Sequence, residues 1–555
     1  MVGRRPMSWL VLGALVVACD GPPSDGPVAT HVDDWRDHVI YEIVVDRFDD
    51  ADPDNDVFDG VGVTPGDLAR HQGGDWAGVR RRLDYLEHLG VTVLWLSPPY
   101  RNVTCCEEEE SYHGYWPLDF TEPNPRFGDL DELVGLVRDA HARGMLVILD
   151  VVPNHAGRVF GYDLDGDGAI GVGEVEPPFS ETPHDALIWS ARPRMWRDGV
   201  ATDLGMDDFH RRGAIDFSRP ATRELGDFPT GLRDLDTENP ATVESLIATH
   251  VRWVELTDVD GFRVDAVPHA PARFWEQFSR GLRERLAALG KERFFLLGEV
   301  FSADPDELAR YTRIDQLDAA FAFDLKVDVI DDIILDGAPP TQARAALEQN
   351  RTRFDASAQP GGIGLDPWRA RVAFADNHDT WRLRGELDDP FAAAVALTVV
   401  FTVDAIPAVY YGTEQELDGR DHHLSREPLF LESDFSEQTP TYRVIQRLAA
   451  ARARSSALRY GDLVVRYAAE HGGREPMGSP DAGMLAYERS HEADRALVVL
   501  NAGLDTSVAT IPTGWGGGVA LGDELESTQD LWRTDAMGRV TVTLPGRSAV
   551  VLRER

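Results

Sequence analysis

The chain has 555 residues, of which 43% are hydrophobic and 27% are charged. It is therefore long enough for two or three globular domains with a large core, and its composition excludes disordered and collagen-like proteins. Acidic residues outnumber basic ones by 95 to 55, which gives a net charge of −40. A field of this sign repels phosphate backbones, so we expect no nucleic-acid partner.

The first residues have the pattern of an export signal. Behind two arginines, an apolar run from Trp9 to Ala18 is too short to cross a membrane as a stable helix. Cys19 follows at once, which resembles a bacterial lipoprotein signal, in which this cysteine is lipidated and becomes the first mature residue. We therefore expect a signal and lipobox in residues 1–19, a tether in 20–34, and an exported protein, periplasmic or on the cell surface, that meets the membrane only through Cys19. An ordinary secretory signal is the alternative.

From about Trp35 to Ser455, short apolar runs alternate with amphipathic helical patterns. The runs are continuous and carry a polar tip, as in strands buried on both faces, and they cover residues 91–97, 145–152, 259–267, 293–300, 371–379 and 405–412. Helical patterns lie between them, for example at 131–144 and 241–258. This alternation predicts an α/β fold with a parallel sheet, and the length favours a closed (β/α)8 TIM barrel in residues 35–455.

Two segments depart from this alternation. Residues 156–236 are rich in Gly, Pro and Asp, and we expect them to form a domain inserted after one barrel strand. From residue 456 to 555, apolar and polar residues alternate, which predicts a C-terminal antiparallel β-sandwich.

Within the inserted segment, residues 163–174 read DLDGDGAIGVGE, which is the pattern of an EF-hand calcium loop. Acidic residues stand at positions one, three and five, glycine at six, and Glu174 at twelve. A calcium sensor has a helix on each side of such a loop, but Pro177 and Pro178 follow here, and a helix interior does not accommodate them. We therefore interpret the loop as a calcium brace for the inserted domain and not as a switch.

Several of the apolar runs end in polar residues that can carry chemistry: Asp150, Arg263 with Asp265, Glu299, and His378 with Asp379. Clustered buried carboxylates repel one another and cost stability unless they are used. In a barrel the carboxyl ends of the strands meet on one face, where active sites lie. The residues alone therefore predict a carboxylate-driven hydrolase or transferase, or a metal site. Glycoside cleavage needs one carboxylic acid to protonate the leaving oxygen and one carboxylate to attack the anomeric carbon.

Four segments, in order, resemble the signature segments of the α-amylase family of glycoside hydrolases: DVVPNH (150–155), GFRVDAVPH (261–269), LLGEV (296–300) and FADNHD (374–379). Further similar segments are YHGYWPLDF (112–120), RDLDTENP (233–240) and AIPAVYYGTEQ (405–415). The resemblance covers about Trp35 to Arg555 and implies a retaining barrel enzyme that acts on α-glucans.

By position, the resemblance implies three catalytic acids: Asp265 as nucleophile, Glu299 as general acid/base and Asp379 as transition-state stabiliser. Arg263 would hold the nucleophile ionised. The other sugar contacts that the resemblance implies are His113, Tyr115, His155, His378 and Arg426, with Tyr115 as the platform beneath the sugar bound before the cut.

Three positions depart from the family pattern. Pro268 stands where calcium-dependent endo-amylases often carry Lys, and Arg233 where many relatives have Pro. Asp421 lies one residue too far from Arg426 to be assigned to the segment that binds sugars further from the cut. The cleavage preference, endo or exo, therefore stays open.

The resemblance also implies calcium as a cofactor at two sites besides the loop. Asn154, Asp234 and the backbone carbonyl of His269 are similar to the family's shared site, which ties the inserted domain to the barrel. A site found in cyclodextrin-forming relatives is matched by Asp50, Asp52, Asn55 and Asp56, with Gly73 and Asp75. In the loop itself the ligands would be Asp163, Asp165, Asp167, the carbonyl of Ala169 and Glu174.

We therefore expect a monomeric α-amylase-type hydrolase that cleaves α-1,4-glucosidic bonds of starch, glycogen or maltodextrins with retention, through a covalent glycosyl-enzyme. The first alternative is a glucanotransferase, cyclodextrin-forming or maltogenic, because it uses the same three acids and because residues 46–56 and 72–76 resemble such relatives. Those relatives usually carry more than one β-domain after the barrel, which counts against it. The second alternative is a non-enzymatic glucan-binding surface protein, disfavoured because the three acids are intact.

Overall fold

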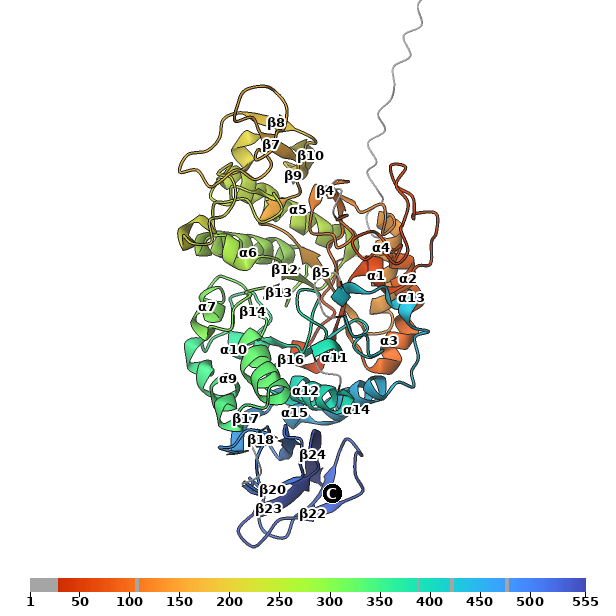
Figure 1. Ribbon diagram of the computed structural model, residues 1–555, viewed down its shortest axis with the longest axis vertical. Coiled ribbons are helices and arrows are strands. Elements are labelled where there is room, and N and C mark those ends of the chain that lie inside the picture. The colour runs from red at the N-terminus through yellow and green to blue at the C-terminus, as the bar shows by residue number, and fades with distance from the viewer. Residues whose placement is uncertain (1–27, 105–108, 387–388, 420–423, 475–478) are drawn as a thin grey trace, which may run out of the picture.

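The computed structural model describes residues 28–104, 109–386, 389–419, 424–474 and 479–555. The expected signal, Cys19 and Asp421 lie outside the described residues. Within them, no helix combines the length and the apolar character that crossing a bilayer requires. Figure 1 shows the inserted segment at one end of the molecule, the barrel in the middle and the C-terminal sheets at the other end.

An eight-stranded parallel sheet forms the centre of the molecule, and its strands follow one another in chain order. They are β1 (Ile40–Ile43), β2 (Val93–Leu96), β5 (Leu146–Val151), β12 (Gly261–Val264), β13 (Phe295–Gly298), β14 (Ala319–Ala320), β15 (Val372–Ala373) and β16 (Ile406–Tyr410). β16 pairs with β1, and a parallel bridge between Phe321 and Val372 joins the two remaining edges. The expected (β/α)8 barrel is confirmed. All residues of these strands are buried, which explains why their sequences are continuous apolar runs.

Helices pack around the barrel (Figure 1). The longest are α4 (Leu130–His141), α5 (Pro240–Thr257), α6 (Ala272–Ala288), α12 (Pro390–Thr402) and α14 (Pro440–Arg454). Shorter helices are α1 (Val45–Phe48), α2 (Trp76–Arg81), α3 (Leu83–Leu89), α7 (Pro305–Arg310), α8 (Phe323–Leu325), α9 (Arg344–Leu347), α10 (Pro367–Ala370), α11 (Leu383–Glu386), α13 (Leu429–Glu432) and α15 (Ser456–Tyr460). The two helical patterns of the sequence are thus α4 and α5. α4 begins at a capping box of Asp129 and Glu132, and α5 begins at Pro240 behind an asparagine cap, which explains where each one starts.

Between β5 and α5 the chain leaves the barrel. This excursion contains β6 (His155–Ala156), β7 (Phe160–Tyr162), β8 (Leu187–Trp189), β9 (Arg194–Arg197), β10 (Val200–Asp203) and β11 (Arg233–Asp234). β9 pairs with β4 (Pro117–Pro123), which itself pairs with β3 (Tyr100–Asn102), so one four-stranded sheet joins the excursion to the loop after β2. No helix flanks the calcium-type loop, which runs from the end of β7.

Arg233, which stands where many relatives have Pro, is fully buried within the excursion. Its guanidinium lies 2.5 Å from Asp227 Oδ2 and donates to the carbonyls of Phe160 and Val175 at 2.8 and 2.9 Å. The arginine therefore joins β7, the end of the calcium-type loop and the segment before β11.

The C-terminal part is antiparallel. Its strands are β17 (Asp462–Ala468), β18 (Met484–His491), β19 (Asp494–Asn501), β20 (Ser507–Pro512), β21 (Ala520–Asp523), β22 (Leu531–Arg533), β23 (Arg539–Leu544) and β24 (Ser548–Glu554). β20 and β23 form a two-stranded sheet beside a six-stranded one, and side chains of both sheets, among them Leu497, Ile511 and Val540, share one core. Burial alternates along β20 and β23, as the expected sandwich requires.

Candidate active site

The carboxyl ends of the barrel strands open into a pocket of about 460 Å³. Of the residues expected at the site, it is lined by Asp265, Glu299, Asp379, His113, Tyr115, His155, His378 and Arg426. Residues that follow different strands, and are far apart in sequence, therefore share one cavity. Arg263 and Asp150 lie behind them and are fully buried.

Arg263 connects the carboxylates at the floor of the pocket. Its Nη1 donates to Asp265 Oδ1 at 2.9 Å and to Asp150 Oδ1 at 3.0 Å, and its Nη2 lies 2.9 Å from Glu299 Oε1. One delocalised cation therefore contacts three acids, and it fixes the relative positions of Asp265 and Glu299.

Glu299 is the carboxyl group of the pocket whose raised pKa lets it act as a proton donor. Burial raises its pKa to about 8, and the charges of Asp265 and Asp379 act in the same direction, against the opposing charge of Arg263. Its Oε2 accepts a hydrogen bond from the backbone amide of Ala266 at 3.2 Å. At neutral pH Glu299 therefore holds a proton that it can donate into the pocket.

The pKa of Asp379 is shifted in the opposite direction, in favour of the ionised carboxylate. Burial would raise its pKa, but His378 and then Arg426 outweigh burial and hold the pKa well below its usual range. His378 Nε2 lies 2.9 Å from Asp379 Oδ2, and Arg426 Nη2 lies 2.9 Å from Oδ1. Asp379 is therefore a permanent negative charge in the pocket.

His378 bonds a second carboxylate, Glu42, which the sequence analysis missed. Glu42 lies within β1, and its Oε1 is 2.5 Å from His378 Nδ1. Burial disfavours the charged imidazole, but Asp379 and Glu42 outweigh it and raise the pKa of His378 to about 10. A buried glutamate inside an apolar run is a sequence signal that could have identified this partner.

Aromatic rings form one wall of the pocket. The ring of Tyr115 stacks on His378 with centroids 5.1 Å apart and an interplanar angle of 10°. Its hydroxyl donates to Asp150 Oδ2 at 2.7 Å, and its backbone amide donates to His113 Nδ1 at 3.0 Å. His155 contacts the backbone carbonyl of Tyr115 through Nε2 at 3.0 Å. Tyr115 is thus held rigidly in place on several sides.

The inserted segment also contributes to the lining of the pocket, which the sequence analysis missed. Phe228 lines the pocket, stacks on His155 at 5.5 Å and packs edge-on against His269 at 4.7 Å. Phe301, two residues after Glu299, lines the pocket with 62% of its surface exposed. Phe228 lies in an irregular stretch whose sequence has no hydrophobic periodicity, so its position could not be predicted. Phe301 is an apolar residue two positions after an expected catalytic acid, and this signal could have identified it.

The N-terminal acidic residues fit a bound cation. The side chains of Asp50 and Asp56 face the bare backbone of Gly73, where an added Cβ would lie 2.5 Å from Asp56 Oδ1 and 3.5 Å from Asp50 Oδ2. Asp56 Oδ1 and the side-chain amide of Asn55 are buried without a hydrogen-bond partner. Burial, with Asp56 and Asp75, raises the pKa of Asp50 to about 6. Such oxygens suit a bound calcium ion, which takes carboxylate and amide oxygens as ligands.

Two of the six residues also have local roles there. Asp75 caps α2, through a 2.5 Å contact of Oδ1 with the amide of Gly78, and its Oδ2 accepts from the amide of Asp52 at 2.7 Å. The side chain of Asp52 accepts from the amide of Asp54 at 3.1 Å.

The residues of the expected shared site fit a bound calcium ion less well, because one of them already has a cationic partner. Asn154 Oδ1 is buried without a hydrogen-bond partner, and β11 places Asp234 beside it, because the amide of Leu235 donates to the carbonyl of Asn154. Asp234 Oδ2, however, lies 2.5 Å from His210 Nδ1. Burial opposes charge on His210, but Asp234 and then Asp236 outweigh it and raise its pKa to about 10. Asp234 thus has a cationic partner that the sequence analysis missed.

The calcium-type loop brings its ligand residues together. One oxygen each from Asp163, Asp165 and Glu174 lies within 4.8 Å of the others. Backbone amides fold the loop around these side chains: Gly171 donates to Glu174 Oε2 at 2.6 Å, and Ala169 donates to Asp167 Oδ1 at 2.7 Å. The donor set consists of hard oxygens, which calcium prefers.

A barrel with three carboxylates at its strand ends, of which Glu299 has a raised pKa and Asp379 a lowered one, is the architecture of a barrel glycosidase. The chain belongs to the α-amylase family, whose catalytic-domain model matches residues 42–456. An α-amylase of Streptomyces lividans is 30% identical over 89% of this chain and 57% of its own length. This chain spans less than two thirds of the length of that protein and of the other curated relatives that follow it in similarity.

Solved structures of two kinds resemble the chain. An Anoxybacillus α-amylase is 27% identical with a TM-score of 0.74, over 94% of this chain and 99% of that one. A cyclomaltodextrin glucanotransferase described as having a three-domain distribution is 25% identical with a TM-score of 0.75, over 93% and 99%.

Proposed function

We propose that the protein hydrolyses α-1,4-glucosidic bonds of starch, glycogen or maltodextrins with retention of anomeric configuration. The observation that carries this proposal is that the surroundings of two carboxyl groups in the pocket differ: Glu299 is protonated at neutral pH, while Asp265 is paired with Arg263. A retaining glycosidase needs one carboxyl of each kind.

In the first step Asp265 attacks the anomeric carbon, and the glycosidic C–O bond breaks as Glu299 transfers its proton to the leaving oxygen. The products are a glycosyl ester on Asp265 and a shortened glucan. In the second step Glu299, now a carboxylate, takes a proton from water, whose oxygen attacks the anomeric carbon and releases Asp265. Asp379 stabilises the positive charge that develops on the sugar in both transition states.

The pocket walls would position the sugar for this attack. Tyr115 offers an aromatic face held by Asp150, and His378, His155, Arg426 and His113 offer hydrogen bonds to hydroxyl groups. Phe228 and Phe301 would contact the glucan from the sides of the cavity.

Calcium fits the N-terminal acidic site and the calcium-type loop best. Asp50 and Asp56, beside the bare backbone of Gly73, would hold one ion, and Asp163, Asp165 and Glu174 another. Bound calcium would neutralise the clustered carboxylates and brace the segments that carry them.

The direct test is hydrolysis of soluble starch by the purified protein. We expect Asp265→Asn to lower the rate by roughly a thousandfold or more, since an amide cannot replace the attacking carboxylate. Asp530→Asn, an exposed position of the C-terminal part, should match the unchanged protein. Proton NMR of the first product should show the α-anomer. A protein inert on starch, glycogen and maltodextrins in calcium, or a first product of β configuration, would overturn the proposal.

A glucanotransferase is the second candidate, supported by the similar cyclomaltodextrin glucanotransferase structure. It would use the same acids but pass the glycosyl group from Asp265 to a sugar hydroxyl instead of water. Chromatography of the starch digest separates the two: linear short products indicate hydrolysis, and cyclic or elongated products indicate transfer.

A further inference from the structure

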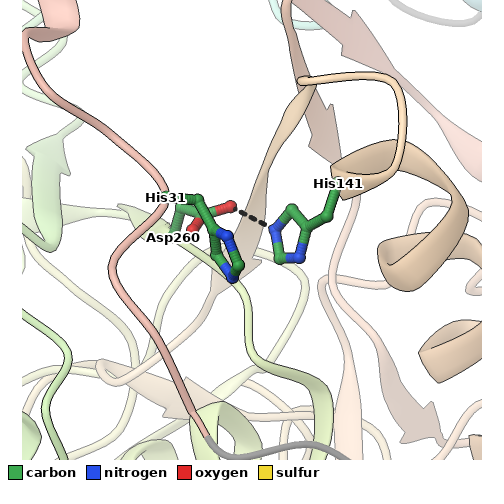
Figure 2. A group of neighbouring side chains, drawn as sticks. All are labelled: His31, His141 and Asp260. Atoms are coloured by element: carbon green, nitrogen blue, oxygen red, sulfur yellow. Dashed lines mark hydrogen bonds and ion pairs between the residues drawn. The ribbon is translucent and has the colours of Figure 1, made fainter.

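A group of titratable side chains at the amino ends of the barrel strands, drawn in Figure 2, is closed by its own contacts. His141 Nε2 lies 2.8 Å from Asp260 Oδ2, and the same oxygen accepts from the amide of Val147 at 2.9 Å. Lys291 lies 2.9 Å from Asp260 Oδ1, and the ring centroids of His31 and His141 are 3.8 Å apart. These groups satisfy one another, so they tie the N-terminal segment to the barrel and do not form a ligand site.

A groove on the outer surface of the barrel has room for a ligand. It consists of two cavities, of about 400 and 540 Å³, which share Trp196 and Arg252 and therefore adjoin. It runs from the loop of Phe58 and the start of α4 across α5 to Leu289, just after α6. Cavities of this size are typical of ligand-binding sites. None of the described residues that line the groove also lines the catalytic pocket.

Trp196 is the aromatic residue common to both cavities. It lies in β9, which packs beside α5 (Figure 1), and its backbone amide donates to Thr249 Oγ1 at 2.9 Å. Its partner in the pairing of β9 with β10 is Ala201, whose side chain is too small to cover the indole. The indole is therefore partly exposed, although the backbone that carries it is fixed. A ring held in this way loses little conformational entropy when a ligand stacks on it.

A second aromatic residue, Phe58, lines the first of the two cavities and is also partly exposed. Its backbone forms two hydrogen bonds with Val61, at 3.0 and 2.9 Å. Arg126 donates to the carbonyl of Val61 at 2.9 Å and to that of Asp56 at 3.2 Å. The loop of Phe58 is thus attached to the segment before α4. The groove therefore contains two aromatic rings whose backbones are both held in place.

The charges of the groove balance, although the whole chain has a net charge of −40. Arg252 contacts Glu255 at 3.1 Å, and its guanidinium lies 5.7 Å from the centre of the Trp196 ring. A balanced lining favours neither an anion nor a cation, but the N–H donors that these arginines do not use on carboxylates can bind hydroxyl groups. The charged residues of the lining are three arginines and three carboxylates: Arg101, Arg252, Arg285, Glu122, Asp129 and Glu255.

The pair of Arg101 and Glu122 repeats this arrangement beside the other ring. The two side chains are 3.4 Å apart, and the guanidinium of Arg101 lies 5.5 Å from the centre of the Phe58 ring. Each aromatic face thus has a charged pair next to it. A sugar ring has apolar C–H faces and a rim of hydroxyl groups, which such a combination of surfaces matches.

We propose that this groove binds a segment of an α-glucan chain outside the catalytic pocket. Two aromatic rings and two charged pairs in a neutral lining have the chemistry to recognise an uncharged, polyhydroxylated chain. That the chain is an α-glucan rests on the proposed function, which makes this polymer the substrate of the catalytic pocket. Binding at both places would hold the protein on a long glucan and raise the local concentration of chain at the catalytic pocket.

Native electrophoresis in gels with increasing glycogen tests this groove. All samples carry Asp265→Asn, so that glycogen is bound but not consumed. We expect Trp196→Ala and Phe58→Ala each to raise the dissociation constant for glycogen about tenfold, because one of two linked contacts is weakened. Phe217→Ala removes an aromatic side chain that is 71% exposed and lines neither the groove nor the catalytic pocket, so it should migrate like the parent. Circular dichroism and thermal melting identify the variants that are folded.

The inference is overturned if either variant, while folded, binds glycogen as tightly as the parent. It is also overturned if Trp196→Ala changes the sedimentation coefficient but not the retention by glycogen, since the groove would then join copies of this chain. The outcome is distinguishable from that of the proposed function. Hydrolysis of starch without retention that depends on Trp196 contradicts this inference alone, and such retention in a protein that is inert on starch contradicts the proposed function alone.

Discussion

Glu299 and Asp379 carry the same functional group in the same pocket, and their neighbours give them opposite protonation states. Glu299 is buried and shares Arg263 with two other acids, which leaves it a weak acid with a pKa of about 8. Asp379 has a cation at each oxygen, and its pKa stays well below the usual range. The chemistry proposed for each follows from these partners, since only a protonated carboxyl can donate to a leaving oxygen.

The pH dependence of hydrolysis should report Glu299. In the proposed mechanism Glu299 must hold its proton, so between pH 6 and 10 kcat/KM should be level on the acidic side of pH 8 and fall about tenfold per unit above it. The measurement is kcat/KM for a soluble maltooligosaccharide between pH 6 and 10, with circular dichroism over the same range to exclude unfolding. An alkaline limb near pH 5, or none below pH 10, would contradict the assignment of Glu299 as the acid.

At the scale of elements, the barrel could be predicted where a strand carries a long apolar run and a polar tip. β5, β12 and β13 have both: Asp265 and Glu299, at the ends of β12 and β13, line the pocket, and Asp150 of β5 lies directly behind them. β14, with two residues, went unrecognised, and so did β1, whose apolar run contains Glu42. The pocket wall formed by Phe228 could not be predicted either, because its position depends on how an irregular segment folds back over the barrel.

Within that irregular segment, the Arg233–Asp227 pair is expected to be essential for stability. Both side chains are buried, so Arg233→Ala leaves an uncompensated carboxylate and should lower the free energy of unfolding by about 3–5 kcal/mol. Arg219→Ala removes an exposed ion pair with Glu181 in the same segment and should leave the unfolding midpoint unchanged. Urea unfolding of both variants checks this, and equal midpoints would show that the buried pair contributes no net stability.

Calcium should brace two separate elements, the loop after β7 and the segment before α2. Calcium at a hundred times its dissociation constant adds about 2.7 kcal/mol per site, so chelation should lower the melting temperature and the activity together. Asp163→Ala with Glu174→Ala should lose part of the calcium-dependent shift but keep the rate per folded molecule in saturating calcium. Asp50→Asn with Asp56→Asn should lose the other part.

The control for the loop variant is Asp185→Ala with Asp203→Ala, which removes the same charge from exposed positions of the inserted segment. It should melt like the unchanged protein at every calcium concentration. A loop variant that also melts like the unchanged protein, with and without calcium, would mean that the loop does not brace the fold.

At the scale of the whole molecule, the catalytic pocket and the start of the described chain lie on opposite faces of the barrel. The pocket is at the carboxyl ends of the strands, whereas the hydroxyl of Thr30 and the indole of Trp35 bond the carbonyls of Gly290 and Arg293, which precede β13. A tether that begins on this face would leave the pocket open to a large polymeric substrate.

Lipidation of Cys19 would therefore hold the barrel by its far face. Val28 is nine positions after Cys19, and the chain between them spans at most about 30 Å, so an anchored molecule would keep its amino-end face near the membrane. Expressed in a bacterium that processes lipoproteins, the full chain should sediment with membranes, and Cys19→Ser should be soluble or retain its signal. Membrane-bound and soluble forms should hydrolyse starch at equal rates per molecule, because the anchor does not obstruct the pocket. Equal solubility of the two forms would exclude the anchor, and a slower membrane-bound form would exclude this orientation.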